Sequence, residues 1–151
     1  MNMNISIICV GKLKEKYWQD AAAEYLKRLS RFAKVEIIEL SESKTDDIGE
    51  ESAAIISHIP KASFVVALDV LGKSLSSEGL ADLISEKAVS GISHISFIIG
   101  GSNGFNDEVR KTADLRLSFS SFTFPPQLMR VILLEQIYRA FKINAGEKYH
   151  K

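Results

Sequence analysis

Apolar and polar positions along the chain form blocks of two alternating kinds. Residues 5–10 are almost continuously apolar and rich in β-branched side chains, as expected of a strand buried on both faces. Residues 14–32 instead place apolar side chains three and four positions apart, which is typical of an amphipathic helix. Because the two patterns alternate to the end of the chain, we expect an α/β fold: a mainly parallel sheet with helices on both faces.

The pattern gives approximate bounds for each element. We predict strands at 5–10, 35–40, 63–69, 94–99 and 115–119, and helices at 14–32, 45–59, 76–89, 106–112 and 125–143. Ser77 is the expected N-cap of the third helix. Pro125 and Pro126 open the last helix, where a missing amide hydrogen costs nothing. The chain has no repeat, linker or low-complexity segment, so we expect one domain spanning residues 1–151.

The last predicted helix is apolar on more than one face between Leu128 and Phe141. Such a helix must be covered on more than one side, and the sheet of a small domain covers only one. We therefore expect a second copy of the chain to cover the other side, in a two-fold homodimer. The alternative is that a loop of the same subunit covers it.

The composition supports a globular protein and excludes several other classes. The chain has 151 residues, of which 46% are apolar and 25% charged, which excludes a disordered or collagen-like polypeptide. We expect no membrane partner, because no apolar run approaches the roughly 20 residues that span a bilayer. No secretory signal is recognisable, so we expect a cytoplasmic protein. A single cysteine, Cys9, excludes a disulfide framework and is expected to be a buried thiol.

The net charge is zero, but the charges are unevenly distributed. Residues 12–34 carry seven basic side chains against three acidic ones, whereas residues 36–51 carry seven acidic side chains and only Lys44 as a base. The C-terminal residues are basic again. Basic stretches of this kind could hold a polyanion. Ordinary solvated surfaces explain the same charges equally well.

Several kinds of catalysis are disfavoured by the sequence. The three histidines are far apart and have no acidic or cysteine ligands at metal-binding spacing, so we expect no metal. Neither a Gly-x-Ser-x-Gly elbow nor a phosphate-binding P-loop is present. We interpret the carboxylates of residues 36–51 as a solvated surface.

Three sharp chain reversals follow the later strands. They contain Gly72, residues 100–104 (GGSNG) and residues 120–125 (SSFTFP). Ligands of open α/β sheets bind at the carboxyl ends of the strands, and glycines let a backbone approach them closely. Backbone groups of such loops can recognise the edge of an adenine ring. The glycine spacing disfavours a nicotinamide dinucleotide, and plain turns remain an alternative.

Taken together, these segments resemble a known family over essentially the whole chain. The blocks are GKLKEKYW (11–18), LDVLGK (68–73), FIIGGSNG (97–104), LSFS (117–120), TFPPQLMRV (123–131), LEQIYRAFKI (134–143) and a terminal Tyr-His. This order is similar to that of the ribosomal RNA large subunit methyltransferase H family, the smallest of the SPOUT methyltransferases. The chain departs from it at Pro126, where the family usually has histidine, and in a shortened segment near residues 45–51.

The resemblance implies a fold, a reaction and a cofactor. The C-terminal part would be tied in a trefoil knot, and the chain would be a homodimer. It would transfer a methyl group from S-adenosylmethionine, leaving S-adenosylhomocysteine, to N3 of the pseudouridine at position 1915 of 23S ribosomal RNA, within the large subunit or the assembled ribosome. The residues at the family's cofactor positions are Leu68, Gly100, Phe119, Ser120, Ser121, Phe122, Thr123 and Phe124, with Gly101 as a neighbour.

The chemistry of N3 points to catalytic candidates among the polar residues near the C-terminus. An imide nitrogen must lose its proton before or as it attacks the methyl group, so a base or an anion-stabilising group is needed. Arg139, Tyr149 and His150 are the candidates, and one chain's tail could close over the other's cofactor. The alternatives are an ordinary Glu135–Arg139 helix pair and a frayed terminus.

Two other classes of function are compatible with an α/β domain of this kind. One is a non-enzymatic RNA- or nucleotide-binding module on the same fold. The other is a flavodoxin-like domain that holds a different nucleotide. Calorimetry with S-adenosylmethionine and a flavin nucleotide would separate the latter from a methyltransferase.

Overall fold

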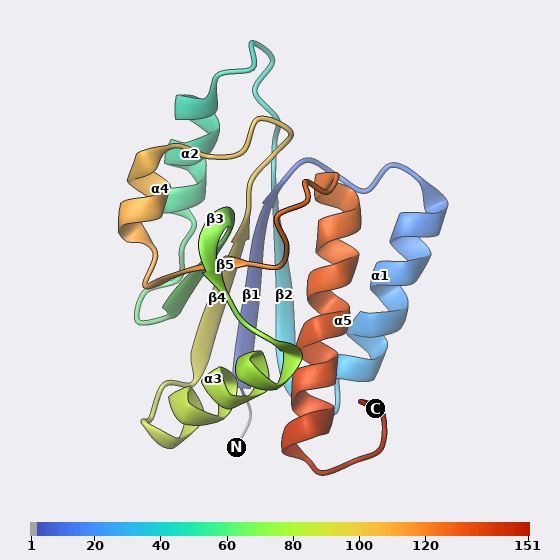
Figure 1. Ribbon diagram of the computed structural model, residues 1–151. Helices are drawn as coiled ribbons and strands as arrows, with labels where there is room; N and C mark the ends of the chain where they lie inside the picture. The colour runs from blue at the N-terminus through green and yellow to red at the C-terminus, as the bar shows by residue number, and fades with distance from the viewer. Residues whose placement is uncertain (1–2) are drawn as a thin grey trace.

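A computed structural model describes residues 3–151 and contains one five-stranded sheet within them (Figure 1). The strands are β1 (Met3–Val10), β2 (Ala33–Leu40), β3 (Phe64–Ser74), β4 (His94–Ile99) and β5 (Leu115–Ser118). Their order across the sheet is β2-β1-β4-β3-β5, and all pairs are parallel. The predicted parallel α/β architecture is therefore confirmed.

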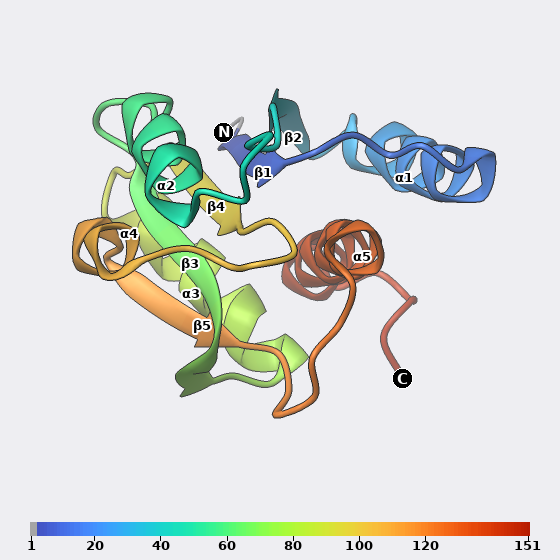
Figure 2. The same ribbon diagram turned by 90° about the horizontal axis from the view of Figure 1, so that it is seen from above.

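Helices cover both faces of this sheet, as Figure 2 shows from above. One face carries α1 (Lys16–Leu29), α3 (Ser77–Val89) and α5 (Pro126–Asn144), and the other carries α2 (Ile48–Ser57) and α4 (Asp107–Thr112). Alternate strand residues supply two separate cores, because successive side chains of a strand point to opposite faces. In β1, for example, Ile7 packs with α5 residues and Ile8 with α2 and α4 residues.

The predicted helix bounds differ from the structure by one to three residues, and the helix predicted at 14–32 covers only Lys16–Leu29. The N-cap of α3 is Ser76, whose hydroxyl accepts from the Gly79 amide at 3.0 Å, so the prediction of Ser77 was wrong by one residue. The helix predicted from residue 45 begins at Ile48 instead. Asp47 caps it through the amides of the first turn, and Asp46 has a left-handed φ of 53° that a helix does not accommodate.

The strand predicted at 63–69 continues to Ser74 after a bulge. Leu117 of β5 is the register partner of both Leu68 and Lys73, so the residues between them are looped out of the ladder. Gly72 lies in this bulge, and a Cβ there would meet the Arg116 carbonyl carbon at 2.6 Å. Glycine is required because the bulge backbone lies directly against β5.

The acidic segment 36–51 is not the uniformly solvated surface that we predicted. Glu51 is buried, and its carboxylate accepts from the Ser43 amide at 2.8 Å. Glu39 forms an ion pair of 2.6 Å with Arg130, whose side chain is only 3% exposed. Glu51 thus pairs with a donor of its own segment, whereas the partner of Glu39 comes from α5, 91 positions along the chain.

A dimer interface can explain only part of the apolar character of α5, because much of the helix is buried within its own subunit. Leu133 and Ile137 are completely buried within the chain itself, where α1, α3 and the sheet surround the helix. A charge at either residue would therefore disrupt the subunit's own core and would not report on a dimer. Leu128, Val131 and Ile132 are half-buried and are not packed against either core, so they are apolar α5 residues available to a partner.

Cys9 lies in the core with 2% of its surface exposed, as predicted. Burial raises the pKa of its thiol to about 11, although Arg130 acts in the opposite direction. The thiol is therefore protonated at pH 8, and we expect the native protein not to react with Ellman's reagent. The same protein in guanidinium chloride should react completely. Rapid reaction of the native protein would contradict this environment for Cys9.

Candidate functional site

A cavity of about 380 Å³ lies at the carboxyl ends of the strands. Its walls come from three segments: the bulge of β3, the loop after β4 and the loop between β5 and α5. These are the three chain reversals that the sequence singled out. All the proposed cofactor residues except Ser121 line the cavity: Leu68, Gly100, Gly101, Phe119, Ser120, Phe122, Thr123 and Phe124.

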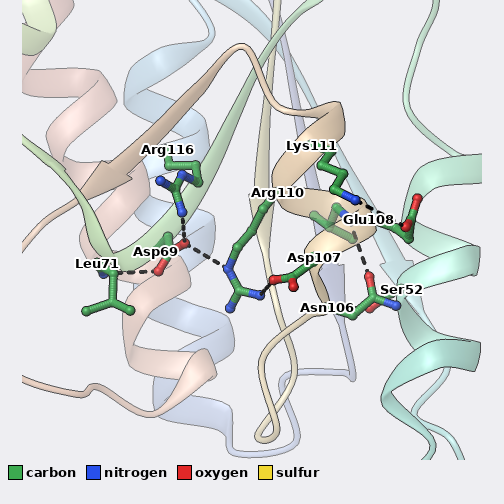
Figure 3. A network of polar contacts seen from close by, with 10 residues as sticks. Ser52, Asp69, Leu71, Asn106, Asp107, Glu108, Arg110, Lys111 and Arg116 are labelled. Atoms are coloured by element: carbon green, nitrogen blue, oxygen red, sulfur yellow. Dashed lines mark hydrogen bonds and ion pairs between the residues drawn. The ribbon is translucent and has the colours of Figure 1, made fainter.

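The bulge of β3 is held by Asp69, whose carboxylate is almost fully buried (Figure 3). One oxygen accepts from the Leu71 amide at 3.0 Å. The other accepts from Arg110 Nε of α4 at 3.1 Å and lies 3.6 Å from Arg116 Nη1 of β5. Asp69 thus ties three elements together at the cavity wall. Asp69 belongs to the LDVLGK block, where no role was predicted for it; its only signal in the sequence was an acidic residue at the end of a predicted buried strand.

The loop after β4 folds back on itself at its glycines. The Gly104 amide donates to the Gly101 carbonyl at 2.9 Å, and Gly104 has a φ of +75°. A Cβ on Gly100 would lie 2.7–2.9 Å from backbone atoms of Gly104. The closed loop therefore leaves no room for a side chain at Gly100, and the backbone itself forms the cavity wall.

The loop between β5 and α5 supplies the aromatic side of the cavity. The Ser120 hydroxyl accepts from the Phe122 amide at 3.0 Å, and the Phe122 ring is 76% exposed at the rim. Ser121 is exposed and does not line the cavity. Pro126, at the position where the family usually has histidine, is the first residue of α5 and part of the cavity wall.

The lining of this cavity is mostly uncharged. Its charged lining residues, Asp69 and Arg110, neutralise each other. The remaining lining is apolar side chains, aromatic rings, hydroxyls and glycine backbone, as is usual for a small-molecule site. Met129 and Phe105 complete the walls, although the sequence analysis did not select them. Within residues 3–151, no cluster of side chains suited to a metal ion is found.

The three catalytic candidates lie together, but not at this cavity. Arg139 donates to Glu135 at 2.6 Å and contacts His150 Nδ1 at 3.1 Å. The Tyr149 hydroxyl donates to the same Glu135 at 2.7 Å, and His150 Nε2 lies 2.9 Å from Glu78 of α3. The tail is thus packed rather than frayed, and the Glu135–Arg139 helix pair is part of the same cluster.

The contacts of this cluster define the protonation of its members. Burial and the hydrogen bond to Glu135 raise the pKa of Tyr149, so its hydroxyl is a donor at neutral pH. The bond to Glu135 likewise raises the pKa of Arg139. Because a guanidinium can only donate, Nδ1 of His150 accepts and the hydrogen of a neutral ring lies on Nε2, facing Glu78.

The cavity and the cluster are at opposite ends of α5. Met129 lines the cavity and Arg139 belongs to the cluster, which separates them by ten helical residues, or about 15 Å. Figure 1 shows the C-terminus at the far end of the molecule from the start of α5. Within one chain, the tail therefore does not reach the cavity.

Known proteins are similar to this chain along almost its whole length. Residues 3–150 match a family model described as a predicted SPOUT methyltransferase. The ribosomal RNA large subunit methyltransferase H of Clostridium novyi is 54% identical, with 99% of this chain and all of the relative covered. The proteins of the same name from Bifidobacterium animalis subsp. lactis and Clostridium botulinum are 53% and 50% identical over the same shares.

Two solved structures share the fold at low sequence identity. A probable methylase family protein from Haemophilus influenzae has a TM-score of 0.59 at 14% identity, covering all of this chain and 72% of its own. The tRNA (m1G37) methyltransferase of Aquifex aeolicus has a TM-score of 0.57 at 15% identity, covering 92% of this chain and 70% of its own. Matched over residues 3–150 by the family model and over 99% of its length by relatives 50–54% identical to it, the chain belongs to the SPOUT methyltransferase family.

Proposed function

We propose that this methyltransferase modifies N3 of the pseudouridine at position 1915 of 23S ribosomal RNA, with S-adenosylmethionine as methyl donor. The observation that carries the proposal is the cavity, whose lining includes all the residues at the family's cofactor positions except one. The names of the close relatives support a ribosomal RNA substrate. We further propose that residues 1–151 act as one domain in the cytoplasm, with the C-terminal part threaded as a trefoil knot.

The cavity fits S-adenosylmethionine in size and chemistry. Its backbone-lined glycine loop suits the edge of an adenine ring, and its apolar and aromatic lining suits the uncharged adenosine part of the cofactor. When bound, the cofactor supplies a methyl group attached to a positively charged sulfur. The protein must align the pseudouridine with that methyl group and provide an acceptor for the proton of N3.

The C-terminal cluster has the residue types needed for that second task. In our proposal, His150 accepts the N3 proton once its Nδ1 leaves Arg139, because imidazole is a suitable base near neutral pH. Arg139 stabilises the negative charge that develops on the pseudouridine ring. Tyr149, which remains protonated, donates a hydrogen bond. The cluster holds these groups in place before substrate arrives.

A homodimer would bring a cavity and a C-terminal cluster, one from each chain, close together. If two α5 helices pack antiparallel about a two-fold axis, the C-terminal cluster of one chain lies beside the cavity of the other. The half-buried Leu128, Val131 and Ile132 provide an apolar surface for such packing at the cavity end of α5. We therefore propose a homodimer with two composite sites, each made by both chains.

The experiment that tests the function is methyl transfer to ribosomal particles that lack this modification. Incorporation of labelled methyl groups should be confined to one pseudouridine of 23S ribosomal RNA, located by mass spectrometry of nuclease fragments. Free RNA, isolated large subunits and whole ribosomes should be compared side by side. Cofactor binding without transfer to any of the three would favour the non-enzymatic alternative.

Substitution of Gly100 should abolish cofactor binding. In Gly100→Ala, the new Cβ would lie within 3 Å of the Gly104 backbone, so the loop must open and distort the cavity wall. We expect S-adenosylmethionine affinity to fall by about 100-fold or more in calorimetry, about 2.7 kcal/mol. Gly79→Ala is the matched control, because its Cβ would meet its nearest neighbour, Ser76 Oγ, at an ordinary 3.4 Å and Gly79 does not line the cavity. A folded Gly100→Ala protein with wild-type affinity would contradict the assignment.

A further inference from the structure

The connection between β1 and α1 exposes lysines at the same edge of the sheet as the cavity. Lys12 and Lys14 are exposed, and neither forms an ion pair within the described residues 3–151. Lys16, at the start of α1, is instead paired with Asp20 at 2.9 Å. Two lysines in this connection are therefore available to an external anion.

This connection is fixed at both ends. The buried Arg130 donates to the Gly11 carbonyl at 2.9 Å, and the Gln19 side chain donates to the Leu13 carbonyl at 2.7 Å. The Gly11 amide in turn donates to Leu40 at 2.7 Å, and Gly11 has a φ of +92°. The backbone that carries Lys12 and Lys14 is thus held in one conformation before any ligand binds, which reduces the entropy cost of binding.

Two aromatic residues, Tyr17 and the half-buried Trp18, follow shortly after the lysines. Tyr17 is 64% exposed although its ring is large and apolar. It packs against Trp18 with the ring centroids 4.9 Å apart and the planes at 65°, so its orientation is defined. Lysines beside an exposed aromatic ring are the combination that binds single-stranded nucleic acid, through phosphates and stacked bases respectively.

The position of this surface relates it to the cavity. Met129 lines the cavity, and its neighbour Arg130 holds Gly11. A Cβ on Gly101, another cavity residue, would lie 3.2 Å from Val10, directly before the connection. Figure 1 shows the β1–α1 connection at the same end of the molecule as the start of α5.

We propose that Lys12, Lys14 and Tyr17 form the surface that binds a single-stranded part of the RNA substrate next to the target nucleotide. The lysines would contact phosphates and Tyr17 would stack on a base. This inference rests on the proposed function for the identity of the substrate, but RNA binding itself is measured separately. It also gives the basic residues near the N-terminus a specific role, for which their charge alone was insufficient evidence.

The test compares two double variants that remove equal charge, one at the carboxyl ends and one at the amino ends of the strands. Lys12→Ala with Lys14→Ala should weaken binding of a fluorescein-labelled single-stranded RNA by about 10-fold or more at low salt. The slope of log affinity against log salt should fall by about 1.4, since each phosphate contact on a single strand contributes about 0.7. Lys34→Ala with Lys61→Ala, exposed near the amino ends of β2 and β3, should change neither quantity. Tyr17→Ala should weaken binding about 5-fold or more without changing the salt slope.

Calorimetry with S-adenosylmethionine tests whether this surface is independent of the cofactor site. The loop variants should bind S-adenosylmethionine as the wild type does, and their KM for the ribosomal substrate should rise while kcat changes little. Equal RNA affinities for the two double variants would overturn the proposal, as would a wild-type protein that binds no RNA and instead binds only a protein component of the ribosome. RNA binding that is weakened by these substitutions but is not accompanied by methyl transfer would support the proposed RNA-binding surface and refute the proposed function.

Discussion

Removal of the last three residues should abolish methyl transfer and leave cofactor binding intact. A chain ending at Lys148 lacks Tyr149 and His150, and with them the hydroxyl bound to Glu135 and the imidazole bound to Arg139. Loss of a general base and its supporting donor typically costs about 10²–10⁴-fold in rate. The affinity for S-adenosylmethionine should stay within about twofold, because no tail residue lines the cavity. Single-turnover methyl transfer and calorimetry measure the two quantities.

Complementation between two inactive chains can show whether the tail serves its own cavity or its partner's. One chain carries the truncation, and the other carries Gly100→Ala. If sites are composite, a heterodimer has one intact site, built from the truncated chain's cavity and the other chain's tail. Random pairing of equal amounts makes half of the dimers mixed, so about a quarter of the wild-type activity should return.

The controls for this experiment are the truncated chain alone, the Gly100→Ala chain alone, and a chain that carries both changes. All three should remain inactive. If the mixture of single variants is also inactive although tagged chains are shown to exchange, each tail serves its own subunit. If the truncated protein alone methylates ribosomes at the wild-type rate, the tail takes no part in catalysis and the base lies elsewhere.

Loss of Glu39 should produce the largest change in stability among the surface carboxylates. Its partner Arg130 is 3% exposed at the side chain, and Nε of this arginine has no hydrogen-bond partner in the described structure. Glu39→Ala would leave the buried guanidinium with only the Gly11 carbonyl as an acceptor. Breaking a buried pair on one side costs about 3–5 kcal/mol, and the 36% exposure of Glu39 reduces this to roughly 2–3 kcal/mol.

Urea unfolding and thermal melts would measure this effect. A loss of that size corresponds to a fall of roughly 4–12 °C in Tm for a chain of this length. Glu36→Ala is the matched control, because Glu36 lies exposed on the same strand and has no ion pair within residues 3–151. The double change Glu39→Met with Arg130→Met should recover much of the lost stability, since it removes both charges. An unchanged Tm in Glu39→Ala would mean that solvent, and not Glu39, compensates the charge of Arg130.

The arrangement of elements and the cavity loops were largely predictable from the sequence. Residues 5–10 and 94–99 read as buried strands because both of their faces are apolar, and the structure confirms both. The loop at Gly100 was recognisable because glycines gathered directly after such a strand. The carboxyl ends of parallel strands lie at one edge of a sheet, so three loops far apart in the sequence converge on one cavity. These features depend on local periodicity and on a general rule of sheet topology.

The features that only the tertiary structure decided depend on contacts between distant residues. The β3 bulge exists because Leu68 and Lys73 both pair with Leu117, and no pattern within residues 64–74 encodes that register. Arg130 is buried although a charged side chain is usually exposed, and Glu39, 91 positions away, makes this burial possible. The sequence by itself determined the order of the elements, the two apolar faces of the sheet and the glycine loops that line the cavity. The tertiary structure decided which charges are buried and that cavity and tail lie at opposite ends of α5, because helix packing and ion pairing depend on residues that the chain brings together only when folded.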